Sequence, residues 1–133
     1  MKISKLLLFF FSFFIISCNN NSTEEILRKT SNSMNKNCPQ IIDKYTTLNN
    51  TTTYGKNYIY NYYIDVSMFN DFKISKNDWA EEQELILTNF YCTDPKFVFF
   101  KEKNVNVTWS YIDLNGSSVG EIKLNQSSCK WIY

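Results

Sequence analysis

The chain has 133 residues, of which 44% are hydrophobic and 20% charged, and its formal net charge is +1. This length accommodates one domain with a single core, and the balanced charge, with no basic cluster, argues against nucleic-acid binding. Histidine is absent. Because histidine is the residue best suited to acid–base catalysis near neutral pH and the commonest metal ligand, its absence disfavours an enzyme. We predict neither a metal ion nor another cofactor.

The N-terminal residues have the order of an export signal. Lys2 and Lys5 precede an apolar run over residues 6–16, which has the length of a signal-peptide core and is shorter than the stretch of about 20 residues that crosses a bilayer. The segment ending at Cys18 resembles a lipobox, the pattern at which bacterial lipoproteins are cleaved just before a cysteine that carries the lipid. The resemblance implies a signal peptide over 1–17 and a lipid on Cys18. The alternative is a plainly secreted protein with an ordinary signal peptide.

Lipid attachment would place the protein in the cell envelope, at the outer membrane and on its periplasmic or outer surface. Residues 18–23 are polar and too poor in apolar groups to pack, so we predict a flexible tether there and a single domain over 24–133. Removing Lys2 and Lys5 with the signal leaves 12 basic against 13 acidic side chains. The net charge therefore identifies no partner, and we expect the protein to contact the membrane through its lipid.

Three cysteines remain once Cys18 is assigned to lipid, namely Cys38, Cys92 and Cys129. An exported chain favours one disulfide, and three pairings are possible. Cys92 ends an expected helix and Cys129 follows the last expected strand, so we favour a bond between these two, which would stabilise the fold by about 3 to 4 kcal/mol in the chain-entropy model. Cys38 is then expected to be a free, buried thiol.

The first half of the chain reads as a helix followed by a hairpin. A helix is expected from a cap at Thr23 through Met34, with a stop at Pro39. The Thr-rich run 45–53 and the alternating run 58–66 are expected strands around a turn at 54–57. Because side chains alternate along a strand, the core face is expected to carry Tyr58, Tyr60, Tyr62, Ile64 and Val66, and the other face Ile59, Asn61, Tyr63 and Asp65.

The second half repeats this order. Ser75 and Asp78 resemble a capping box and open an expected helix that ends near Cys92 and turns Trp79, Ile86 and Phe90 inward. A short helix over 96–101 follows the start signal Thr93-Asp94-Pro95. Two further strands are expected, one with Val105, Val107, Trp109 and Tyr111 on one face, the other over 118–124, joined by a turn at Asp113-Leu114-Asn115-Gly116.

These elements define the α+β class. We predict an N-terminal helix and an antiparallel sheet of about four strands, built as two hairpins separated by two helices. Segregation of helices from hairpins predicts that the helices pack on one face of the sheet.

Several segments are similar to a group of small exported bacterial proteins and lipoproteins of uncharacterised function. They are Asn35-Lys36-Asn37-Cys38-Pro39, the Tyr-rich strand, Tyr91-Cys92-Thr93-Asp94-Pro95, and Tyr111-Ile112-Asp113-Leu114-Asn115-Gly116 before Cys129. The similarity spans most of residues 35–130. It supports the bond between Cys92 and Cys129 and implies no activity.

Chemistry-bearing motifs are scarce. Asp113, Asn115 and Gly116 repeat part of a calcium loop but lack its remaining ligands, so a hairpin turn is the better interpretation. With 9 Tyr, 11 Phe and 3 Trp, aromatic residues are in surplus. Ile59 and Tyr63, on the uncovered sheet face, are candidates for a surface that binds an envelope protein or a glycan, although Tyr also simply suits strands.

We therefore predict a small envelope lipoprotein without enzymatic activity, acting as a binding, accessory or inhibitor/immunity-type protein. The alternative is a ligand carrier or enzyme with an internal pocket.

Overall fold

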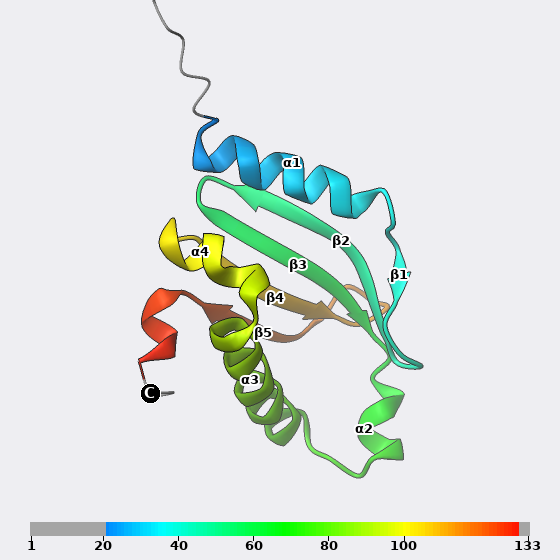
Figure 1. Ribbon diagram of the computed structural model, residues 1–133. Coiled ribbons are helices and arrows are strands. Elements are labelled where there is room, and N and C mark those ends of the chain that lie inside the picture. The colour runs from blue at the N-terminus through cyan, green and yellow to red at the C-terminus, as the bar shows by residue number, and fades with distance from the viewer. Residues whose placement is uncertain (1–20, 131–133) are drawn as a thin grey trace, which may run out of the picture.

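The computed structural model describes residues 21–130 and has the α+β architecture expected from the sequence (Figure 1). The expected signal peptide and lipidated Cys18 lie outside the described residues. The elements are α1 Thr23–Asn35, β1 Gln40–Ile41, β2 Thr46–Tyr54, β3 Asn57–Ile64, α2 Ser67–Asp71, α3 Lys76–Thr93, the 3-10 turn η1 Pro95–Phe97, α4 Val98–Glu102, β4 Asn106–Ile112, β5 Ser118–Leu124 and the 3-10 turn η2 Gln126–Cys129.

The strands form one sheet in the order β1-β2-β3-β4-β5. β2 and β3 form the first hairpin around Gly55, whose φ of +54° is easily adopted only by a residue without a side chain. β4 and β5 form the second hairpin. The hairpins meet through β3 and β4, which run parallel, with Tyr60 opposite Trp109. The sheet is thus mixed rather than antiparallel, because α2, α3 and α4 carry the chain back to the end where β3 began.

The helices cover one face of the sheet, as expected. That face carries the core, which includes Tyr58, Ile64, Val107, Trp109, Tyr111 and Ile122. α1 lies along β2, and α3 crosses the second hairpin (Figure 1). The contact of α3 is close, because a Cβ added at Gly120 would lie only 3.3 Å from the Trp79 ring. A side chain at position 120 would require the Trp79 ring to shift by a few tenths of an ångström.

The outer edge of β2 is closed by side chains of α1. The Asn35 side-chain amide donates to the Thr51 carbonyl at 2.9 Å and accepts from the Thr51 N–H at 2.7 Å, as a neighbouring strand would do. Ser31, which is buried, bonds the Thr51 hydroxyl at 2.7 Å. Because an unpaired strand edge invites association with other strands, the asparagine of the Asn-x-x-Cys-Pro segment has a structural role.

Three expectations for individual side chains are wrong. Val66 lies beyond the end of β3, at the N-cap of α2, and is 44% exposed. Ile86 and Phe90 are exposed rather than buried, at 51% and 40%, although the Phe90 ring still meets that of Phe97 edge-on. The residues that α3 turns inward are Trp79, Leu87 and Tyr91, because a four-residue step follows one side of a helix with 3.6 residues per turn. The helix at the N-terminus starts one residue earlier than expected, with Ser22 as its cap.

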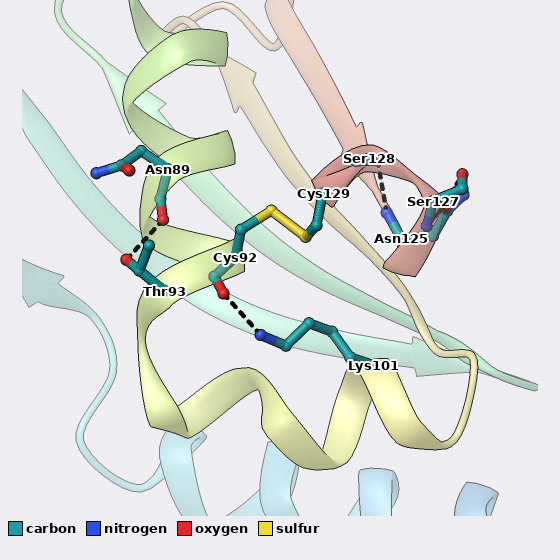
Figure 2. The surroundings of a disulfide bond; sticks show 8 residues. All are labelled: Asn89, Cys92, Thr93, Lys101, Asn125, Ser127, Ser128 and Cys129. Atoms are coloured by element: carbon teal, nitrogen blue, oxygen red, sulfur yellow. Dashed lines mark hydrogen bonds between the residues drawn. A yellow bond between two sulfur atoms is a disulfide. The ribbon is translucent and has the colours of Figure 1, made fainter. Parts of the chain in front are cut away.

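The structure joins Cys92 and Cys129 by a disulfide, the pairing favoured from the sequence (Figure 2). The bond connects the last turn of α3 with η2. Lys101 of α4 donates to the Cys92 carbonyl at 2.8 Å, so three elements meet at this point. Cys38 is free among the described cysteines and is half-buried rather than fully buried.

Trp109→Ala is expected to destabilise the protein by about 3 to 5 kcal/mol, because the ring is 3% exposed and its removal leaves a cavity between the sheet, Tyr91 and Phe97. Tyr63→Ala, on the uncovered face, is the matched control and should cost less than about 1 kcal/mol. Chemical denaturation of both variants measures this difference. Equal, large losses would show that both faces of the sheet are buried.

Candidate functional site

A groove of about 770 Å³ opens at the end of the sheet where β2 begins and β3 ends. Its floor is formed by Tyr62, Tyr111 and Trp79. One wall is the loop from β1 to β2, and the other is formed by α2, the segment after it and the first half of α3. The lining residues are Ile42, Asp43, Lys44, Tyr45, Thr46, Tyr62, Met68, Phe72, Ile74, Trp79, Glu82, Gln83, Leu87 and Tyr111. We call this feature the groove.

The floor of the groove is a rigid aromatic cluster. Tyr62 stacks on Tyr111 with ring centroids 5.1 Å apart, and Trp79 meets the Tyr111 ring edge-on at 5.1 Å. Burial raises the pKa of Tyr62 to about 12 and also raises the pKa of Tyr111. Both hydroxyls are therefore neutral at physiological pH and can donate a hydrogen bond to a bound molecule.

A series of hydrogen bonds fixes the β1–β2 loop, one wall of the groove, to α2. The Tyr45 hydroxyl donates to Asp71 at 2.7 Å and accepts from Lys44 at 2.9 Å, while the Tyr45 ring packs edge-on against Phe72 at 5.4 Å. The hydrogen bond to Tyr45 raises the pKa of Lys44. Lys44 is thus already engaged within the wall, and the free charge at the rim belongs to acidic residues, chiefly Glu82.

Apolar side chains are exposed at the mouth of the groove. Phe72 is 66% exposed and Ile42 is 51% exposed, and next to Ile42 in sequence lies Ile41, also exposed. Large apolar side chains that gather around a concave, aromatic floor are typical of a site that another molecule covers.

The opposite face of the sheet, called the open face here, carries Thr52, Ile59, Asn61, Tyr63, Thr108, Ser110, Glu121 and Lys123. Ile59 and Tyr63 are both half-buried on it. Ile59 lines a hollow of about 550 Å³ whose other residues are mostly polar, and Tyr63 is not among the residues that line it. Four residues apart on one strand, the two side chains are separated by about 13 Å. Their role in binding stays a prediction.

Neither a metal-binding cluster nor a membrane-spanning helix is found within the described residues. Within 21–130 no group of three His, Cys, Asp or Glu side chains is placed to hold a metal ion. The Asp113 carboxylate accepts from the N–H groups of Asn115 and Ser117 at 2.8 and 2.9 Å, which fits the hairpin turn expected there. No helix in the same range is long and apolar enough to cross a membrane.

Sequence reasoning found the aromatic floor but missed the groove. Tyr62, Trp79 and Tyr111 were assigned to the core, which is where they lie. The walls depend on the contact between Tyr45 and Phe72. These two residues are 27 positions apart, and no local sequence pattern predicts that contact. A sequence signal for the groove was Phe72, a large apolar residue between Asp71 and Lys73 in a polar loop.

No protein-family model matches the chain, and no curated protein sequence matches it. Solved structures do share its fold. A Pseudomonas aeruginosa protein assigned as secreted has a TM-score of 0.68 at 14% identity, over 80% of this chain and 92% of that one. The pilotin EpsS of the Vibrio vulnificus type 2 secretion system has a TM-score of 0.61 at 12% identity, and the type II secretion system pilotin AspS of Vibrio cholerae has 0.59 at 11%. Each match covers 80% of this chain and 91% of the pilotin.

These likenesses show that the α+β fold of this chain also occurs in exported and secretion-associated bacterial proteins. At such identities they define a fold and not an activity.

The buried tyrosines predict a loss of stability at alkaline pH. Tyr62 has a pKa of about 12 in the folded protein and about 10 when unfolded, so between these values the unfolded chain releases its proton first and unfolding becomes more favourable. The loss is at most about 1.4 kcal/mol per pH unit for each such tyrosine. Tyr62→Phe should reduce this slope in denaturation measured from pH 9 to 12, whereas Tyr54→Phe, at an 83% exposed position, should leave it unchanged. Equal slopes in all three proteins would contradict this assignment.

Proposed function

We propose that this protein is a small envelope lipoprotein without enzymatic activity, which is anchored by a lipid on Cys18 and binds a segment of another envelope protein in the groove. The observation that carries the proposal is the groove itself, a concave aromatic surface with exposed apolar residues at its mouth. The lipobox-like N-terminus supports the location, and the likeness to a secreted protein and two pilotins supports it further.

The chemistry of the groove defines its partner. An apolar floor and Phe72 favour an occupant with apolar side chains. The charged residues that line the groove are Asp43, Lys44 and Glu82, and Lys44 lies 3.8 Å from Asp71 outside the lining. The remaining negative charge favours basic side chains in the occupant. We therefore propose a peptide segment of a partner protein that carries both apolar and basic residues.

An accessory role fits this arrangement. Two proteins with this fold are named as pilotins of type 2 secretion systems, and we propose by analogy that this chain assists an envelope assembly rather than acting on a substrate. An enzyme is disfavoured because the sequence has no histidine and the groove has no cysteine or serine among its lining residues. A carrier of a small apolar ligand is the second candidate, since the volume of the groove would accept one.

Cys18→Ala is expected to abolish lipid attachment and to release the protein from membranes, because a diacylated N-terminus provides the two-chain affinity that stable anchoring requires. Membrane fractionation together with fatty-acid labelling measures both effects. An unlabelled wild-type protein that fractionates as Cys18→Ala does would refute the anchor and favour a plainly secreted protein.

Groove binding is tested by placing a photo-crosslinking phenylalanine analogue at Phe72 in growing cells, with Tyr63 on the open face as the matched position. We expect the Phe72 position to crosslink to an envelope protein through a peptide that contains apolar and basic residues.

A charge reversal provides the control. Glu82→Lys at the rim should abolish the crosslink, and Glu121→Lys on the open face should preserve it. A crosslink from Tyr63 alone would move the binding site to the open face. A groove that retains a small apolar molecule on purification and gives no crosslink would favour the carrier.

A further inference from the structure

The start of α1, which follows the expected tether, lies at one end of the fold, opposite the groove (Figure 1). α1 starts beside the turn between β2 and β3, and α4 and η2 lie at the same end (Figure 1). The start of β4 lies at this end too, because the Asn106 N–H donates to the Lys56 carbonyl in that turn at 2.9 Å. We call this part of the surface the tether end, and it comprises residues 22–29, 54–57, 94–106 and 124–130.

Charge is divided between the two ends of the molecule. The tether end carries seven basic and four acidic residues, and one of the acids, Glu25, is paired with Lys29 at 2.9 Å. The far end, comprising 36–46, 65–84 and 113–117, carries eight acidic and four basic residues. The net charge is therefore +3 at the tether end and −4 at the far end, although the two nearly cancel over the whole domain.

The tether end contains a polar hollow with one lysine in its lining and two more close to it in sequence or through a hydrogen bond. Lys130 lines a concavity of about 580 Å³ together with Asn104, Asn106 and Asn125. Lys103 precedes Asn104 in sequence, and Lys56 is bonded to Asn106 through its carbonyl. All three lysines are exposed, and none of them has an ion-pair partner among the described residues. Exposed Tyr54 stands next to them, with an apolar ring and a polar tip suited to a membrane–water interface.

The chain between Cys18 and α1 limits the distance of the domain from its anchor. Four residues lie between Cys18 and Thr23, and the five residue steps from one to the other span at most about 18 Å in a fully extended chain. β2 has nine residues and is about 30 Å long. The start of α1 must therefore stay near the bilayer, whereas the far end reaches it only if the domain lies on its side.

We infer that the tether end is a membrane-binding surface that rests on anionic lipid headgroups and points the groove away from the bilayer. The inference rests on the proposed lipid on Cys18. The lysines attract the negatively charged surface within a Debye length of about 8 Å at physiological salt, and the acidic far end is repelled by it. The lipid holds the protein at the membrane, and the charge division sets its orientation.

The test uses the mature, acylated protein in nanodiscs of zwitterionic lipid with or without anionic phosphatidylglycerol, and with a gadolinium-chelating lipid that attenuates nearby amide signals in NMR spectra. In anionic nanodiscs, attenuation should be several-fold stronger at residues 54–57 and 103–106 than at 43–46 and 113–117. The difference should shrink in zwitterionic nanodiscs and in 1 M salt, where the Debye length is about 3 Å.

Two double variants with the same change in net charge complete the design. Lys56→Glu with Lys103→Glu should remove the preferred orientation, and Lys36→Glu with Lys73→Glu at the far end should retain it. Equal attenuation at both ends of an acylated protein, or a preference unaffected by the first pair, would overturn the inference and leave lipid attachment intact. If mass spectrometry finds no acyl chain on the exported protein, both the anchor and the inference are overturned.

Discussion

The fold depends on the aromatic stacking that joins its two hairpins across β3 and β4. Tyr60 stacks on Trp109 at 5.6 Å and Tyr62 on Tyr111 at 5.1 Å, each pair formed by residues directly opposite in the parallel register. Such a pair contributes about 0.5 to 1.5 kcal/mol beyond the burial of its surface. Without the pairing of β3 with β4, which these stacks reinforce, the hairpins would be separate small ribbons, and isolated two-stranded hairpins are marginal in water.

The same stack positions the helices and the groove. Trp79 packs on Tyr111 and anchors α3 over the second hairpin, while α1 is fixed on the first hairpin by Asn35 and Ser31. The two helices therefore cover different strands. At the far end of the stack, half-buried Tyr62 and buried Tyr111 line the floor of the groove. The groove thus follows from how the core is built, and its floor is rigid because it is part of the core.

The sequence predicted α1, β2 to β5, α3 and α4 because alternation, helical spacing and caps are local properties, but it did not predict the short β1 and α2. The packing of the helices on one face followed from their segregation from the hairpins. Alternation of Tyr and Trp along β3 and β4 marks the buried face, and Ser75 with Asp78 marks the start of α3. The parallel pairing of β3 and β4 could not be predicted, since it depends on the path of the chain through α2, α3 and α4. The inward side of α3 was placed wrongly because Ile86, Leu87, Phe90 and Tyr91 form adjacent apolar pairs, and only packing decides which member of each pair is buried.

The candidate site was less predictable than the fold. Ile59 and Tyr63 followed correctly from strand alternation as side chains of the uncovered face, but the groove is built by contacts distant in sequence, such as Tyr45 with Asp71 and with Phe72. For Asn35, the sequence marked the segment but not the role of the side chain. Its segment was noted as a motif, yet only the structure shows that the side chain closes the edge of β2.

The central claim is that the groove, and not the open face, is covered by a partner in the envelope. Hydrogen–deuterium exchange of the protein in isolated envelope membranes, compared with the same protein purified in detergent, tests it most directly. We expect amides in 42–46, 68–74 and 79–87 to be protected only in the envelope, with exchange in 50–54 and 118–123, which carry open-face residues and no groove residue, unchanged. Protection confined to 50–54 and 118–123, or identical exchange in both preparations, would contradict it.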